Sequence, residues 1–200
     1  MNTTAVIKDS SINVNAPLAT STFSRILIDY LHTYYRNPER DLIIMCIGTD
    51  RSTGDSLGPL IGYKLDKSLR RYNNVFIHGT LEDPVHAKNL KDSIDYVYNT
   101  YQDPFVIAID ACLGKLERIG YVTVGHGPLK PGAGVNKELP PVGDLHITGI
   151  VNLGGFMEYI ILQNTRLNLV MKMADTVSEA FQYALWKFSK NTEKEQSGFH

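Results

Sequence analysis

Two hydrophobic periods alternate along the chain. Short apolar runs are typical of strands buried in a sheet, whereas apolar residues at every third or fourth position are typical of one helix face. The short runs predict strands over 42–47, 75–78, 105–109, 120–124 and 144–151. The helical spacing predicts helices over 23–34, 57–69, 86–101, 156–162 and 167–188. Because parallel neighbours need a helical crossover, this alternation predicts an α/β fold with three α/β/α layers around an open, mostly parallel sheet.

The remaining segments set the expected domain boundaries. Residues 1–20 are polar and lack a period, which predicts a flexible N-terminal segment, and residues 190–200 predict a polar C-terminal tail. We expect residues 21–189 to form a single α/β domain, because 200 residues suffice for one sizeable core but not for two full domains. Residues 125–143 are rich in glycine and proline, a composition typical of a functional loop.

Composition and charge narrow the class of protein. Hydrophobic residues make up 43% of the chain and charged residues 20%, as in soluble globular proteins. The formal net charge of -1 provides no positive field that would attract nucleic acid. No apolar run reaches the roughly 18 residues of a membrane span, and no secretory signal begins the chain. We therefore expect a cytoplasmic protein without a membrane partner, in which Cys46 and Cys112 stay reduced.

Acidic residues follow two of the predicted strands. Asp50 and Asp55 lie in the loop after the first strand, and Asp110 ends the third. Ligands of open α/β sheets bind beyond the carboxyl ends of the strands, so these side chains can meet across one crevice. Two carboxyl groups held close together resist double ionisation, so one keeps a proton while the other activates water. Asp55 and Asp110 are therefore candidates for a hydrolytic pair.

Structural roles compete with this hypothesis. Asp55 precedes a predicted helix and is equally suited to be its N-cap. Asp50 and Arg51 can pair with each other and order the loop, and we expect this role for both. Asp110 is harder to explain in this way, because a carboxylate beside a buried strand needs a partner or a function.

Two further arrangements stay open. Gly54–Gly58 satisfies the Gly-x-Ser-x-Gly pattern of serine hydrolases, and Asp110 and His146 follow Ser56 in the order of a hydrolase triad. However, Ser56 lies well beyond the end of the first strand, whereas such a serine normally follows its strand directly. Alternatively, Asp55, Asp110 and His146 form a chemically reasonable set of metal ligands. Cys112 lies two residues beyond Asp110, whose charge disfavours a reactive thiolate.

The loop after the first strand resembles a known family. Gly48–Pro59 is similar to the signature of the YyaC-like sporulation proteins, a group regarded as spore proteases. Ala108–Ala111 and Pro131–Val135 also resemble segments of the spore germination protease, an endopeptidase that degrades small acid-soluble spore proteins. The same core is similar to that of the hydrogenase maturation peptidases. The resemblance implies a phosphorylase/hydrolase-like fold.

The resemblance also implies a function. It assigns the catalytic pair to Asp55 and Asp110, and it implies an endopeptidase of spore-forming bacteria that acts on a protein substrate, such as small acid-soluble spore proteins, within the developing spore. Residues expected to bind substrate or order the loops are Gly48, Asp50, Arg51, Ser56, Gly132 and Gly134.

The same resemblance leaves cofactor and assembly open. The nickel site of the maturation peptidases makes His146 a candidate third ligand for a divalent metal, although the aspartate pair requires no cofactor. A homo-oligomer stays open, but neither tetramer assembly nor zymogen control can be carried over from the resemblance, because this chain is shorter than the germination protease. The remaining alternative is a non-catalytic binding protein that kept the fold.

Overall fold

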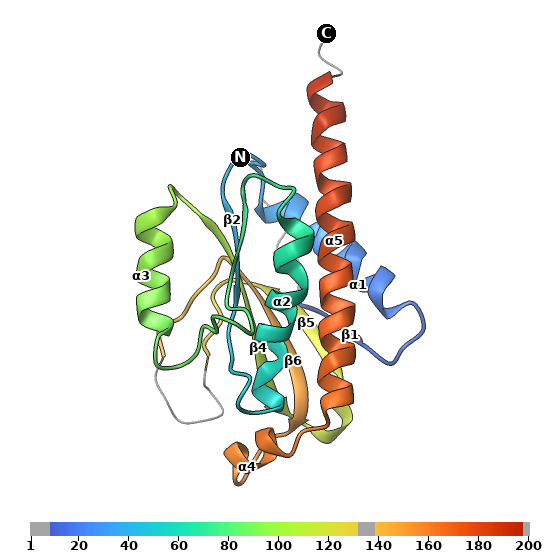
Figure 1. The fold of residues 1–200 in the computed structure, drawn as a ribbon. Helices are drawn as coiled ribbons and strands as arrows, with labels where there is room; N and C mark the ends of the chain where they lie inside the picture. The colour runs from blue at the N-terminus through green and yellow to red at the C-terminus, as the bar shows by residue number, and fades with distance from the viewer. Residues whose placement is uncertain (1–8, 132–138, 198–200) are drawn as a thin grey trace.

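A single mixed sheet lies at the centre of the molecule. The computed structural model describes residues 9–131 and 139–197 (Figure 1). Within these residues, six strands form the sheet in the order β1-β5-β6-β4-β2-β3. The strands are β1 (Ser10–Asn13), β2 (Leu42–Cys46), β3 (Val75–His78), β4 (Phe105–Gly114), β5 (Tyr121–His126) and β6 (Leu145–Leu153). The helices are α1 (Ala19–Tyr34), α2 (Leu57–Leu69), α3 (Leu90–Thr100), α4 (Glu158–Gln163) and α5 (Leu167–Ser197), with short 3-10 turns η1 (Gly54–Ser56) and η2 (Leu116–Arg118).

Most of the sheet is parallel, as predicted. β3, β2, β4 and β6 run in the same direction, whereas β5 is antiparallel to both of its neighbours, β6 and β1. The first half of β4 is buried on both faces, which explains its continuous apolar run.

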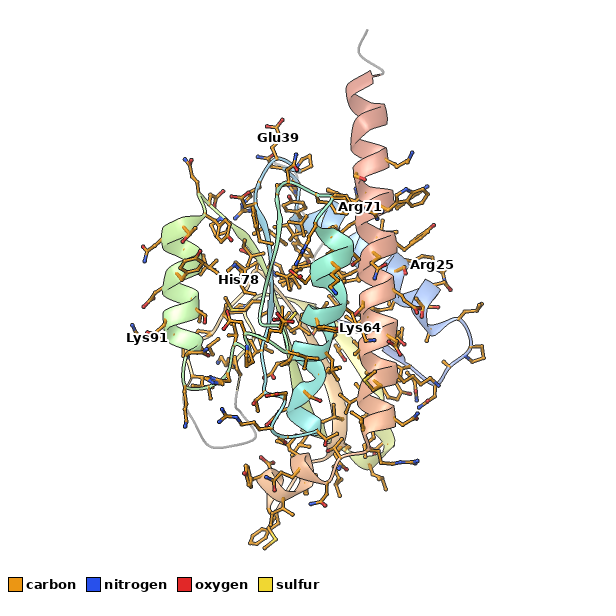
Figure 2. All side chains as sticks on the ribbon, in the orientation of Figure 1. Arg25, Glu39, Lys64, Arg71, His78 and Lys91 are labelled. Atoms are coloured by element: carbon orange, nitrogen blue, oxygen red, sulfur yellow. The ribbon has the colours of Figure 1, made fainter. Side chains whose placement is uncertain are left out.

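Helices cover both faces of the sheet and complete the three predicted layers. Figure 1 shows α1, α2 and α5 on one side of the sheet and α3 on the other. Ile44 and Ile107 contact the larger core beneath α1, α2 and α5, while Met45 and Ala108 contact the smaller core beneath α3. Lys64 of α2, labelled in Figure 2, forms an ion pair with Asp175 of α5 at 2.7 Å. The predicted α/β fold is confirmed.

The predicted chain ends need correction. The flexible segment expected over 1–20 is wrong for its described part, because Ser10–Asn13 pair with β5 and α1 begins at Ala19. Ile12 and Val14 are buried, but a four-residue polar strand is too short to show a period. At the other end, α5 continues to Ser197, so most of the tail predicted over 190–200 is helical.

Other boundaries differ in ways that affect the site. α3 begins at Leu90 rather than near 86, because the preceding residues form a turn in which the His86 N–H donates to Asn89 Oδ1 at 2.7 Å. β4 extends past its predicted end to Gly114, so Asp110 and Cys112 lie within a strand.

Neither Cys46 nor Cys112 forms a disulfide. In the part of the chain that the structure describes, no helix is both long and apolar enough to span a membrane.

Candidate active site

Asp110 lies at a step in the edge of the sheet. β2 ends at Cys46, which pairs with Ile109, while β4 and β6 continue and pair Asp110 with Thr148. Side chains alternate along a strand, so Asp110 faces the same side as Ala108, toward the layer of α3. Its Oδ1 accepts a hydrogen bond from the Ala111 N–H at 2.8 Å. The carboxyl group is therefore fixed at the carboxyl end of the parallel strands, and Asp110 as a whole is half-buried.

The loop after β2 folds back so that Asp55 returns to the same edge. The Gly48 N–H donates to the Val85 carbonyl at 2.8 Å, and the Thr49 N–H donates to the Asp55 carbonyl at 3.1 Å. Gly48 has φ +146°, and a Cβ at this position would lie 2.0 Å from the Asp55 carbonyl oxygen. Only glycine allows this closure.

A second glycine brings α2 against the end of β2. A Cβ on Gly58 would lie 2.1 Å from the Ile47 carbonyl oxygen, so a side chain there would push the helix away from the strand. Both glycines of the motif therefore serve to place Asp55 at the sheet edge.

The two aspartates interact electrostatically. Burial raises the pKa of Asp55 above its usual value. Burial also raises the pKa of Asp110 well above its usual value, and the charge of Asp55 raises it further, while the hydrogen bond from Ala111 opposes the shift. The structure thus brings the two predicted carboxyl groups together at one edge. Such a pair favours a state in which one group holds a proton and the other is ionised.

The alternative role of Asp55 as a helix cap is not supported. α2 begins at Leu57 with Ser56 as its N-cap residue, and Asp55 lies within the η1 turn that precedes it. No side-chain hydrogen bond caps either η1 or α2. The carboxyl group of Asp55 is therefore not used to complete the helix.

Ser56 is not arranged as a nucleophile. Its Oγ donates to the Thr53 carbonyl at 2.7 Å, and the side chain is only 6% exposed. His146 Nδ1 is bonded instead to the Gly127 carbonyl at 3.0 Å. Among the hydrogen bonds of the described residues, none joins Ser56 to a histidine. The Ser56, Asp110 and His146 triad is thus not formed.

His146 also does not join the two aspartates. It pairs with Ala108 in the sheet, and its ring lies over Gly125 of β5, where Cε1 and Nε2 would each be 2.5 Å from an added Cβ. Across residues 9–131 and 139–197, no three His, Cys, Asp or Glu side chains lie close enough to hold a metal ion together. The ligand set of Asp55, Asp110 and His146 is therefore not assembled within the described residues.

The predicted loop residues have different outcomes. Asp50 and Arg51 are exposed and form no ion pair with each other within the described residues, so the expected pairing is wrong. Instead, the Arg51 N–H donates to Thr49 Oγ1 at 3.3 Å, and backbone bonds order the loop. Gly132 and Gly134 lie outside the described residues.

One neighbour of Asp110, Thr148, was not evident from the sequence. Thr148 of β6 pairs with Asp110 of β4 and forms a hydrogen bond with the Cys112 thiol. Burial and the charge of Asp110 raise the pKa of Cys112 to about 11, so this thiol is unreactive at neutral pH, as expected. The position of Thr148 beside Asp110 could not be predicted from the sequence, because it depends on the register between β4 and β6.

Comparison with known proteins identifies the family. Residues 11–180 match the model of a family described as "Protein of unknown function (DUF1256)". The chain belongs to the DUF1256 family. This DUF1256 protein is 60% identical to YyaC of Bacillus subtilis (strain 168) over 141 residues, which are 70% of this chain and 67% of YyaC. The resemblance to the YyaC-like group is confirmed.

A solved structure shares the fold of this DUF1256 protein. It is the [NiFe] hydrogenase maturation protease HycI from Thermococcus kodakarensis KOD1, with a TM-score of 0.54 and 16% sequence identity. The match covers 80% of this chain and 98% of that one. At this identity the likeness establishes the architecture, and the chemistry must be argued from the residues of the present chain.

Proposed function

We propose that this protein is an endopeptidase in which Asp55 and Asp110 activate water. The observation that carries the proposal is the pair itself: two carboxyl groups meet at the carboxyl edge of a parallel sheet, and the charge of one raises the pKa of the other. The fold shared with a maturation protease supports this assignment. Structural ion pairs elsewhere in proteins usually place a carboxylate beside a cation, whereas here a second acid is the neighbour.

The pKa shifts suggest a role for each residue. Asp110 has the more strongly raised pKa and therefore holds the shared proton, while Asp55 is ionised. Asp55 removes a proton from water as its oxygen attacks the carbonyl carbon of the scissile peptide. Asp110 then gives its proton to the departing nitrogen, so the C–N bond breaks without releasing an amide anion.

The substrate follows from the family resemblance. We propose that small acid-soluble spore proteins are cleaved in the cytoplasm of the developing spore. The resemblance of Gly48–Pro59 to the YyaC-like signature, and of Ala108–Ala111 and Pro131–Val135 to segments of the spore germination protease, is the basis for this substrate class.

The variants Asp55→Asn, Asp110→Asn and Ser56→Ala test the proposal. We expect the asparagine variants to cleave a purified small acid-soluble spore protein at least about a thousandfold more slowly than wild type, because each lacks one proton-transfer group. Ser56→Ala should keep its activity and lose about 1 kcal/mol of stability, because only the bond to Thr53 is removed. Mass spectrometry of the fragments provides the measurement.

Two other outcomes would assign the protein a different function. Cleavage that is lost in Ser56→Ala but survives in both asparagine variants would identify a serine hydrolase. A wild type that binds the spore protein without cutting it would be a binding protein that retains the fold. In both cases the aspartate mechanism is rejected.

Metal removal is expected to leave cleavage unchanged. The donor groups near Asp55 and Asp110 do not form a three-ligand set within the described residues, so the pair is expected to act without a metal. We expect the same rate before and after dialysis against a chelator, measured with the same spore protein. A rate that falls on dialysis and returns with Ni²⁺ or Zn²⁺ would contradict this expectation.

A further inference from the structure

Large apolar side chains are exposed where β6 leads into α4. Phe156 is 91% exposed, and Met157 and Tyr159 are each 64% exposed. We call this surface the α4 patch, and it consists of Leu153, Phe156, Met157, Tyr159 and Ile160. Single exposed apolar residues are ordinary, but a contiguous group of this size marks an interaction site.

The backbone holds this surface in place. Met157 adopts a left-handed conformation with φ +61°, which is unfavourable for any residue other than glycine, and Gly155 has φ +141°. The Gly154 N–H donates to the Gly114 carbonyl at the end of β4, at 2.7 Å. The Asn152 amide donates to the Ile161 carbonyl at 3.3 Å and to Thr165 Oγ1 at 3.2 Å. The α4 patch is thus a fixed feature, and strained backbone of this kind is concentrated at functional sites.

The α4 patch adjoins the candidate active site, because α4 contacts the η1 turn that contains Asp55. Leu162 of α4 is buried and lies against Gly54, the residue before Asp55. Figure 1 shows α4 at the same end of the molecule as the start of α2 and the end of β6, and its side chains project from that end in Figure 2. A polypeptide held at Asp55 and Asp110 therefore has α4 beside it.

The chemistry of the surface suggests what it binds. Glu158 is the single charged residue between 153 and 163 in the sequence, and its carboxylate accepts the Gly155 N–H at 3.3 Å. We propose that the α4 patch is an exosite, separate from the scissile bond, that binds an uncharged apolar segment of the protein substrate. This inference rests on the proposed peptidase function. Its occupant is the substrate because α4 contacts the turn that carries Asp55.

The test compares a patch variant with a matched control. The patch variant carries Phe156→Ser, Tyr159→Ser and Ile160→Ser, and the control carries Tyr183→Ser and Trp186→Ser, which replace exposed aromatic residues of α5. Both sets are exposed, so folding should be retained, and circular dichroism checks this. We expect KM for a full-length spore protein to rise about tenfold or more in the patch variant, and by much less in the control. With a ten-residue peptide that covers only the cleavage site, the rise in KM caused by the patch substitutions should be at least ten times smaller than with the full-length protein.

A binding measurement separates this inference from the peptidase proposal. Fluorescence anisotropy of a labelled 15-residue peptide rich in Leu and Phe is measured with the Asp110→Asn chain, with and without the patch substitutions. Binding that weakens tenfold or more in the patch variant supports the exosite, even if wild type cleaves nothing and the peptidase proposal fails. Equal binding by the two chains, or no binding by either, overturns the exosite. An equal rise in KM for the full-length spore protein and the ten-residue peptide also overturns it. A dimer of the wild type that the patch substitutions dissociate, seen by analytical ultracentrifugation, would assign the surface to a second copy and also overturn it.

Discussion

The Asp110→Asn variant is expected to lose cleavage by at least about a thousandfold and to be more stable than wild type at neutral pH. The raised pKa of Asp110 means that the folded protein favours the protonated carboxyl group. The unfolded chain releases that proton at a lower pH, so the free energy of unfolding falls as pH rises from the unfolded pKa through the folded pKa. Asparagine cannot ionise and can still accept the Ala111 N–H, so it removes this loss.

Denaturant unfolding at pH 5 and pH 8 measures this effect. We expect the variant to gain about 1 kcal/mol over wild type at pH 8, the size common for stabilising substitutions, and less at pH 5. Asp50→Asn is the control, because Asp50 is exposed in the neighbouring loop and its replacement should change stability by less than about 0.5 kcal/mol. An Asp110→Asn chain that is less stable than wild type at pH 8 would show that the carboxylate stabilises the fold rather than serving catalysis.

Gly48→Ala is expected to disrupt the candidate site and destabilise the protein by about 3 kcal/mol or more. The added Cβ would lie 2.0 Å from the Asp55 carbonyl oxygen and 2.9 Å from Cδ of Pro59. The loop must therefore open, which breaks the bond from Thr49 to Asp55 and moves Asp55 away from Asp110. Urea unfolding measures the stability, and cleavage of the spore protein measures the site.

Gly155→Ala separates strain from steric clash. Gly155 has φ +141°, close to the +146° of Gly48, but an added Cβ there meets nothing within 4 Å. This control should cost only the conformational strain, about 1–2 kcal/mol. Equal losses of stability in the two variants would mean that the close approach of Gly48 to Asp55 does not hold the loop.

The fold was largely evident from the sequence because buried parallel strands leave a clear signature. The apolar runs at 42–47 and 105–109 became β2 and β4, and the acids that follow them met at one edge, as strand direction requires. β1 was not predictable, since its four residues gain their structure from pairing with β5 rather than from their own pattern. The formation of β1 therefore depends on tertiary strand pairing, which the local sequence does not indicate.

The composition of the site was only partly predictable. The glycines that satisfy a serine-hydrolase pattern have another cause: Gly54 lies against Leu162, and Gly58 lies against Ile47. His146 follows the expected order along the chain, but register places it opposite Ala108, and its ring lies over Gly125. The spacing of residues in the sequence cannot establish such register or ring orientation. The buried apolar runs did indicate where the parallel strands lie, although β4 continues past Asp110 to Gly114.

The most direct measurement of the central claim is the titration of the Asp110 carboxyl carbon by NMR, in wild type and in Asp55→Asn. It requires no substrate. The coupled pair predicts that Asp110 titrates well above its usual range in wild type and at a lower pH in Asp55→Asn, where burial alone still raises its pKa. An Asp110 that titrates near the ordinary value of about 3.9, or one whose pKa does not change when Asp55 is replaced, would contradict the aspartate pair.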